Sequence, residues 1–141
     1  MEKLVALHKH WLIADSIMQF VMAPIDKDSI LPEESRQSVE MHSAWLRLLV
    51  LYSLIYVVIE GYEELKMTNE KIDYLLSNRE FVNKLKRLRN GTFHYQEKPI
   101  PDKVMDFLEL KDSEIWINQL HKSFGLFFHE NLIKVKLEQM S

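Results

Sequence analysis

The stretch MHSAWLRLLVLYSLIYVVIEGY, residues 41–62, decides the fold that we expect for this chain. Its apolar residues recur at alternating spacings of three and four, which is the period of one helix face. That stripe consists of Met41, Trp45, Leu48, Tyr52, Ile55, Ile59 and Tyr62. Further apolar residues cover much of the opposite side, namely Leu46, Val50, Leu54 and Val57. A helix that is apolar nearly all round is predicted to form the centre of a bundle or to bind a partner chain.

The central helix is predicted to span residues 32–65, because Pro32 and the two acidic residues after it are typical of a helix start. A first helix over residues 2–22 is indicated by a single apolar stripe that ends at Ala23-Pro24. A polar loop, Asp26-Lys27-Asp28-Ser29, connects the two. The longest run without a charge has 12 residues, Leu48 to Ile59. It is too short to span a bilayer, so a buried core helix and no membrane association are expected.

The next helix carries the basic residues that matter below. Ser77 and Glu80 have the spacing of a capping box, which predicts the start of this helix, and Asn90-Gly91 is typical of a helix end. Phe81, Leu85 and Leu88 are expected to point inward.

Further helices are predicted on both sides of that segment. Short ones are expected over residues 69–76 and 102–110 and a long one over 112–137, with a tight loop at Pro99-Ile100-Pro101. The sequence therefore predicts a single all-α domain over residues 1–141, an up-and-down bundle of four main helices plus one or two short helices.

Composition limits the function only broadly. The chain has 18 basic and 21 acidic residues and no cysteine. Disulfides and thiolate metal sites are thereby excluded, which is compatible with a reducing cytoplasm. The first residues, Met1 to Leu4, show no signal-peptide pattern, so a cytoplasmic protein is expected.

The charge balance reverses between residues 79 and 98, where six basic residues stand against two acidic ones. Lys84, Lys86 and Arg87 are expected to point away from the core of the bundle. A local basic patch on a mildly acidic protein favours a discrete site for a polyanion. The alternative is a solvated helix face without a ligand.

The remaining histidines do not predict a site. His8 and His10 are expected at the surface beside the first apolar stripe, and His42, His121 and His129 are expected to be structural or exposed. No histidine pair has the four-residue spacing of a helical zinc site. No metal and no other cofactor is therefore predicted.

The sequence Arg89-Asn90-Gly91-Thr92-Phe93-His94-Tyr95 closes the basic run at the predicted helix end. An arginine holds phosphate oxygens with a fixed fork of donors, and a histidine transfers protons near neutral pH. Metal-free cleavage of RNA needs both groups. The alternative interpretation is that Arg89 and Asn90 cap helix carbonyls while His94 packs beside Tyr95.

This segment resembles the motif of HEPN (higher eukaryotes and prokaryotes nucleotide-binding) domains, which are helical bundles. Their motif is an arginine, a polar residue after it, and a histidine a few residues later. Arg89, Asn90 and His94 fit this pattern, with four residues between the arginine and the histidine. The long helices before and after the motif also resemble that family, in particular a small stand-alone bacterial or plasmid-borne member.

The resemblance implies a metal-independent endoribonuclease site, formed where two protomers of a homodimer meet. RNA would be the substrate, and many members of the family serve in toxin–antitoxin or defence systems. The resemblance leaves open whether this chain has an antitoxin protein as a partner. Arg89 would stabilise charge on the phosphate, His94 would act as acid or base, and Asn90 would orient His94 or the phosphate. Other members of the family bind RNA or proteins without cleaving anything, and that alternative remains open. RNA would further contact Lys84, Lys86, Arg87 and Tyr95.

Overall fold

The computed structural model describes residues 1–24 and 30–140, without the side chains of residues 135–140. The predicted polar loop at residues 26–29 lies outside the described residues. The described part contains four long and two short helices and no strand, which confirms the predicted all-α bundle. The helices are α1 (Glu2–Phe20), α2 (Glu33–Glu64), α3 (Glu70–Leu76), α4 (Arg79–Phe93), α5 (Asp102–Leu108) and α6 (Ser113–Met140).

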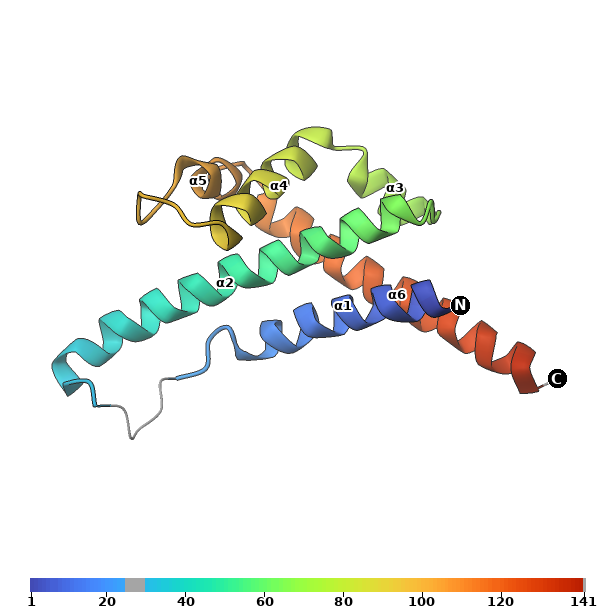
Figure 1. Ribbon diagram of the computed structural model, residues 1–141, viewed down its shortest axis with the longest axis horizontal. Helices are drawn as coiled ribbons and strands as arrows, with labels where there is room; N and C mark the ends of the chain where they lie inside the picture. Colours follow the sequence, from blue (N-terminus) through green and yellow to red (C-terminus); the bar gives the residue numbers. More distant parts are fainter. Residues whose placement is uncertain (25–29, 141) are drawn as a thin grey trace.

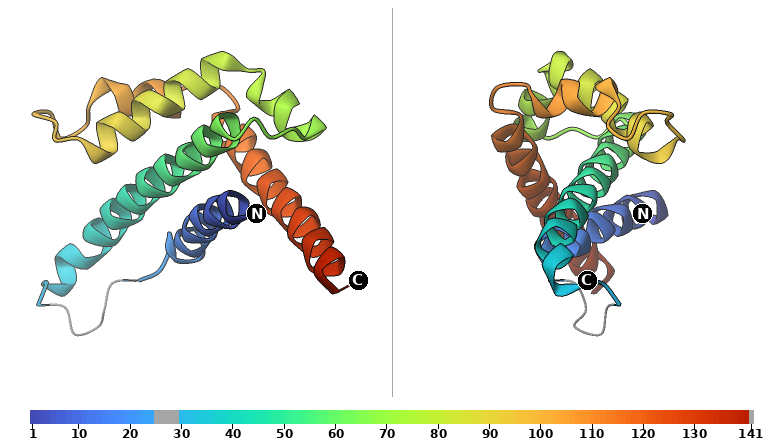
Figure 2. Two further views of the ribbon diagram at one scale, coloured as in Figure 1. Left: turned by 45° about the vertical axis from the view of Figure 1, so that its right-hand side comes forward. Right: turned by 90° about the vertical axis from the view of Figure 1, so that its left-hand side faces the viewer.

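Helix α2 lies at the centre, as its sequence predicts. Helix α1 packs along one side of α2 and α4 along the other, each running in the opposite direction to α2, and α6 crosses near the C-terminal end of α2 (Figures 1 and 2). The buried apolar residues of α2 are Leu49, Leu51, Tyr52, Ile55, Tyr56, Val58, Ile59 and Tyr62. They meet a buried aromatic set from α5 and α6, namely Phe107, Trp116, Phe124, Phe127 and Phe128.

The N-terminal half of α2 differs from the prediction. Met41 belongs to the predicted inward stripe, yet 70 % of it is exposed, and Leu46 is 45 % exposed. The first turns of α2 extend beyond the ends of α1 and α4 (Figure 1). Both side chains border hollows rather than the core, and Leu46 lines one of them together with Gly91 and Thr92 of α4. Helix α2 is the one described helix that is long and apolar enough to cross a membrane. The core helices of soluble proteins meet the same criterion, and the C-terminal half of α2 forms such a core here.

Two predicted boundaries of α4 are wrong. The side chain of Asn78, not Ser77, caps α4 by accepting from the backbone N–H of Phe81 at 3.4 Å. Ser77 follows the last turn of α3, and its hydroxyl donates to the carbonyl of Tyr74 instead. The helix also continues past Gly91 to Phe93, because Gly91 is helical and buried against α5 rather than free to end the helix.

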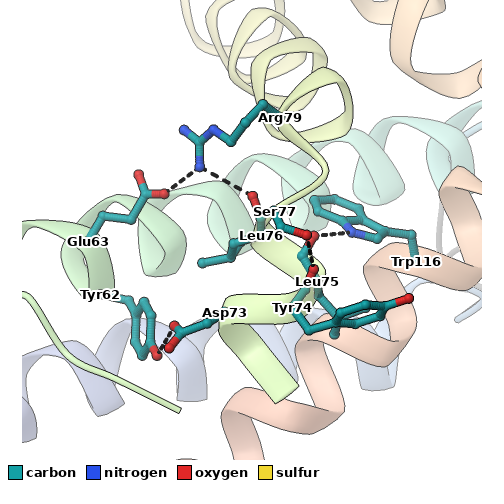
Figure 3. A network of polar contacts seen from close by, with 9 residues as sticks. All are labelled: Tyr62, Glu63, Asp73, Tyr74, Leu75, Leu76, Ser77, Arg79 and Trp116. Carbon is teal, nitrogen blue, oxygen red and sulfur yellow. Dashed lines mark hydrogen bonds and ion pairs between the residues drawn. The ribbon is translucent and has the colours of Figure 1, made fainter. Parts of the chain in front are cut away.

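A network of polar contacts fixes α3 and the start of α4 (Figure 3). The hydroxyl of Tyr62 donates to Asp73 at 2.7 Å, and the indole N–H of Trp116 donates to the carbonyl of Leu75 at 2.9 Å. Arg79 pairs with Glu63 at 2.7 Å. The first cation of the basic segment therefore holds α4 against α2.

Candidate functional site

The motif occupies the last turns of α4 and the residue after it. His94 has extended backbone, with φ −102° and ψ 143°, and its N–H donates to the carbonyl of Asn90 at 3.1 Å. A Cβ at Gly91 would stand 3.2 Å from Cγ2 of Val104 and 3.3 Å from Cβ of Lys103. Since these approaches are tighter than ordinary contact, a residue without a side chain lets α4 pack closely on α5. The close packing fixes the position of the motif.

Arg89 is held by three contacts. Its Nε donates to Oδ1 of Asn90 at 3.0 Å, and its Nη1 lies 3.5 Å from Oε2 of Glu60 on α2. Its guanidinium carbon lies 4.8 Å from the ring centroid of Tyr56, within the range of a cation–π contact. Burial raises the pKa of Tyr56, as does nearby Glu60, whereas Arg89 acts to lower it. The Nη2 group of Arg89 has no hydrogen bond within the described residues, so it remains available to an anion.

The contacts of Asn90 contradict the capping alternative. Its side chain orients Arg89, and its carbonyl holds the backbone of His94. A carbonyl near the helix end, that of Leu88, instead accepts from Thr92 Oγ1 at 2.9 Å, and Gln96 Nε2 donates to the carbonyl of His94, just after the helix, at 3.2 Å. Asn90 therefore contacts the side chain of Arg89 and the backbone of His94, although the sequence left open what it orients.

The imidazole of His94 is exposed and makes no hydrogen bond or ring contact within the described part of the chain. Tyr95, beside which His94 would pack in the alternative interpretation, is 92 % exposed. Phe93 is 49 % exposed on the other side. The histidine thus has the accessibility that proton transfer to a ligand requires. No hydrogen bond joins it to the side chain of Arg89 within the described protomer.

The basic residues around the motif are mostly paired. Lys84 lies 3.4 Å from Glu80, and Arg87 lies 2.7 Å from Asp106. Lys86 is exposed and has no ion pair among the described residues. Four acids from outside residues 79–98 pair with cations inside that segment, namely Glu60, Glu63, Asp102 and Asp106. They offset the local excess of four positive charges, so the folded surface is less basic than the sequence alone indicates.

Two hollows flank the end of α4. The first, which we call the apolar hollow, has a volume of about 240 Å³ and is lined by Trp45, Leu46, Gly91, Thr92, Pro99 and Pro101, among others. The second, the polar hollow, has a volume of about 450 Å³ and is lined by Arg87, Tyr95, Gln96, Lys98, Pro101 and Lys103, together with Glu97 and Asp102. Tyr95 and Arg87, both predicted to contact RNA, therefore share one surface.

A different set of histidines lies between α1 and α6. His121 is 2 % exposed, its Nε2 lies 3.0 Å from Oδ1 of Asp15, and its ring stacks on Trp11 at 5.0 Å. His8 was expected at the surface, but it is partly buried, stacks on Trp11 at 6.0 Å and lies 5.2 Å from the ring of Phe128. Burial lowers the pKa of His8. The helical spacing of His8, Trp11 and Asp15 already placed them on one face of α1.

Among the described residues, no group of three or more histidine, aspartate or glutamate side chains is arranged to hold a metal ion. Comparison of the chain with protein-family models, with curated proteins and with solved structures finds no match. Function must therefore be argued from the site itself.

Proposed function

We propose that this chain is a HEPN-like endoribonuclease that cleaves RNA without a metal ion. The observation that carries the proposal is the contrast within one helix end: Arg89 is held by Asn90, Glu60 and Tyr56, while the imidazole of His94 is exposed and unpaired. A fixed guanidinium beside an accessible histidine suits phosphoryl chemistry, because positioning and charge stabilisation do most of the work there.

The reaction uses the nucleophile that RNA itself provides. The 2′-hydroxyl loses its proton to a base and attacks the adjacent phosphorus, and the bond to the 5′-oxygen breaks. A general acid protonates the leaving oxygen, so the products are a 2′,3′-cyclic phosphate and a 5′-hydroxyl. Arg89 binds the phosphate oxygens as negative charge grows on them. His94 serves as the base or the acid.

The electrostatics of the helix end bear on the binding of a phosphate. The C-terminal end of a helix carries partial negative charge, which repels a phosphate. Glu60 adds a negative charge 3.5 Å from Arg89. A phosphate therefore has to displace Glu60 from a long, single-pronged contact that is worth little at an exposed site.

Each protomer supplies one histidine at this site, whereas the reaction needs both a general acid and a general base. A two-fold homodimer that brings two Arg89–His94 segments to one groove supplies the second group. Exposed apolar side chains lie beside the motif and provide a surface for such contacts, namely Phe93 (49 %), Tyr95 (92 %) and Ile100 (52 %). Light scattering should then show a dimer at micromolar concentration; a monomer would count against the composite site.

In the proposed setting the protein is a cytoplasmic toxin or defence effector restrained by an antitoxin protein. The second candidate function is a helical module that binds RNA or a protein without cleavage. The ion pairs of Lys84 and Arg87 favour the protein-binding form of this candidate, because they leave fewer free cations for any polyanion.

The decisive experiment incubates purified protein with mixed cellular RNA in EDTA. The proposal expects cleavage products with 5′-hydroxyl ends from the wild type and none from the double variant Arg89→Ala/His94→Ala. His10→Ala is the matched control, since His10 is an exposed histidine on α1. Cleavage only after addition of magnesium, or equal cleavage by the double variant, would refute the mechanism. Binding of RNA without cleavage by any variant would establish the second candidate.

A further inference from the structure

Along the chain, His94 lies between residues that line the two hollows at the end of α4. Gly91 and Thr92, just before it, line the apolar hollow, while Tyr95 and Gln96, just after it, line the polar hollow. Pro101 borders both hollows. A linear ligand that passes over His94 can therefore reach an apolar site on one side and a charged site on the other.

The apolar hollow has the composition of a stacking site. Trp45 supplies an aromatic ring and Pro99 and Pro101 supply rigid apolar walls. Its volume of about 240 Å³ is below the roughly 300–1,000 Å³ of sites for drug-sized ligands, so it suits a single ring system. Unpaired bases of RNA are recognised by stacking on aromatic side chains.

The polar hollow has the composition of a backbone site. Arg87, Lys98 and Lys103 line it together with two acidic residues, Glu97 and Asp102. The Lys98–Asp102 contact is long, at 3.7 Å, and both side chains are mostly exposed. A phosphodiester competes well with such a pair, because exposed ion pairs contribute little and phosphate contacts dominate the affinity for nucleic acids.

We propose that the apolar hollow binds one unpaired base of single-stranded RNA, next to the phosphate at His94, while the polar hollow holds the backbone on the other side. Trp45 is then a residue that positions the substrate and restricts it to single strands. A base inside a duplex cannot enter, because it is paired and stacked. This inference depends on the proposed function for the identity of the ligand, but it does not require cleavage.

The test uses the three tryptophan side chains, which give separate indole N–H signals in an NMR spectrum of the ¹⁵N-labelled protein. The N–H groups of Trp11 and Trp116 donate to the carbonyls of His121 and Leu75, so these two signals serve as internal references. The probe is a short single-stranded RNA with 2′-O-methyl groups, which cannot cleave itself. The signal of Trp45 should shift saturably, while the references stay in place and a duplex of the same sequence causes no shift.

Two exposed leucines provide a matched pair of variants. Leu46→Glu places a carboxylate at the rim of the apolar hollow, and Leu12→Glu places one on α1, on the other side of α2 from α4 (Figure 1). The two leucines are similarly exposed, at 45 % and 47 %. Leu46→Glu should weaken binding of the probe about 5- to 150-fold, the range for loss of one stacked base, and Leu12→Glu should not.

Variants of Trp45 itself complete the test. Trp45→Phe should retain much of the affinity because it keeps a ring, whereas Trp45→Leu should lose it, and thermal melts establish that both are folded. An unmoved Trp45 signal, or unchanged affinity of Leu46→Glu, would overturn the proposal. So would a Trp45 shift that follows protein concentration without RNA, because a second copy would then fill the hollow.

The failure of this inference differs from that of the proposed function. A shift of the Trp45 signal with no cleavage of unmodified RNA would support the base site and refute the ribonuclease function. Cleavage of RNA with an unmoved Trp45 signal would support the ribonuclease function and refute the base site.

Discussion

Two histidines of this molecule, His94 and His121, have opposite surroundings. His121 on α6 is 2 % exposed, pairs with Asp15 and stacks on Trp11. His94 after α4 is exposed, and its imidazole has no partner in the described part of the chain. His121 lies within the largely apolar helix α6, whereas His94 follows the basic helix α4.

The difference separates a stabilising role from the chemical role that we propose for His94. The interactions of His121 are already made within the protein, so its ring contributes to the packing of α1 on α6. The ring of His94 contributes nothing visible to the fold, and its cost of exposure is small because imidazole is polar. A histidine that the fold does not use is free to bind and protonate a ligand.

The largest expected effect belongs to His94. His94→Ala should lower RNA cleavage by about 10²–10⁴-fold, the usual contribution of a general acid or base. Its free energy of unfolding should change by no more than about 0.5 kcal/mol, because no folded contact of the side chain is lost. Gel-based cleavage assays and urea unfolding measure the two quantities. Persistent cleavage, or a large loss of stability, would remove the distinction between the two histidines.

Arg89→Lys should be nearly as damaging. A lysine keeps the charge but cannot bind phosphate with two prongs, so we expect about 10²–10³-fold slower cleavage. Neither the wild type nor the Arg89→Lys variant should cleave DNA of the same sequence, since DNA lacks the 2′-hydroxyl. Lys9→Ala is the control for simple loss of charge, because Lys9 is exposed on α1, outside the proposed site. Equal activity of Arg89→Lys and wild type would show that a point charge suffices.

His121→Ala should show the reverse pattern. Loss of the buried ring and of its contact with Asp15 should cost about 2–4 kcal/mol of the free energy of unfolding. The hydrogen bond from Trp11 should survive, because its acceptor is the backbone carbonyl of residue 121. Cleavage measured well below the melting temperature should remain within a few-fold of wild type. A drop comparable to that of His94→Ala would contradict a purely structural role.

The smallest effect concerns pH and His8. Burial lowers the pKa of His8 in the folded protein, so the unfolded chain binds this proton more readily. The contribution of neutral His8 to the free energy of unfolding is present above the unfolded pKa of about 6.5. It is lost as pH falls through the lower pKa of the folded protein. His8→Phe keeps a ring beside Trp11 and should flatten the decline of melting temperature below pH 7. The same slope in both proteins would assign the acid sensitivity to other groups.

The sequence accounted for most of the fold because the apolar period is strong over long segments. The bounds of α2, 33–64 against the expected 32–65, show this, and so do the buried positions Leu85 and Leu88 of α4. The boundary errors arose where a residue had two possible partners. Serine is a residue type that often caps the start of a helix. Here α3 ends one residue before Ser77, and the hydroxyl of Ser77 donates to the carbonyl of Tyr74 in α3.

For the site, the sequence by itself determined which residues follow one another: an arginine, a polar neighbour and a histidine at the end of a basic helix. Only the tertiary structure decided their surroundings. It placed Glu60 and Tyr56 of α2 against Arg89, acids of other segments against the basic run, and Trp45 beside Gly91 and Thr92. The physical reason is that helical periodicity is a local property of the chain. The charge and shape of a surface depend on residues far apart in sequence, which meet only when the helices pack.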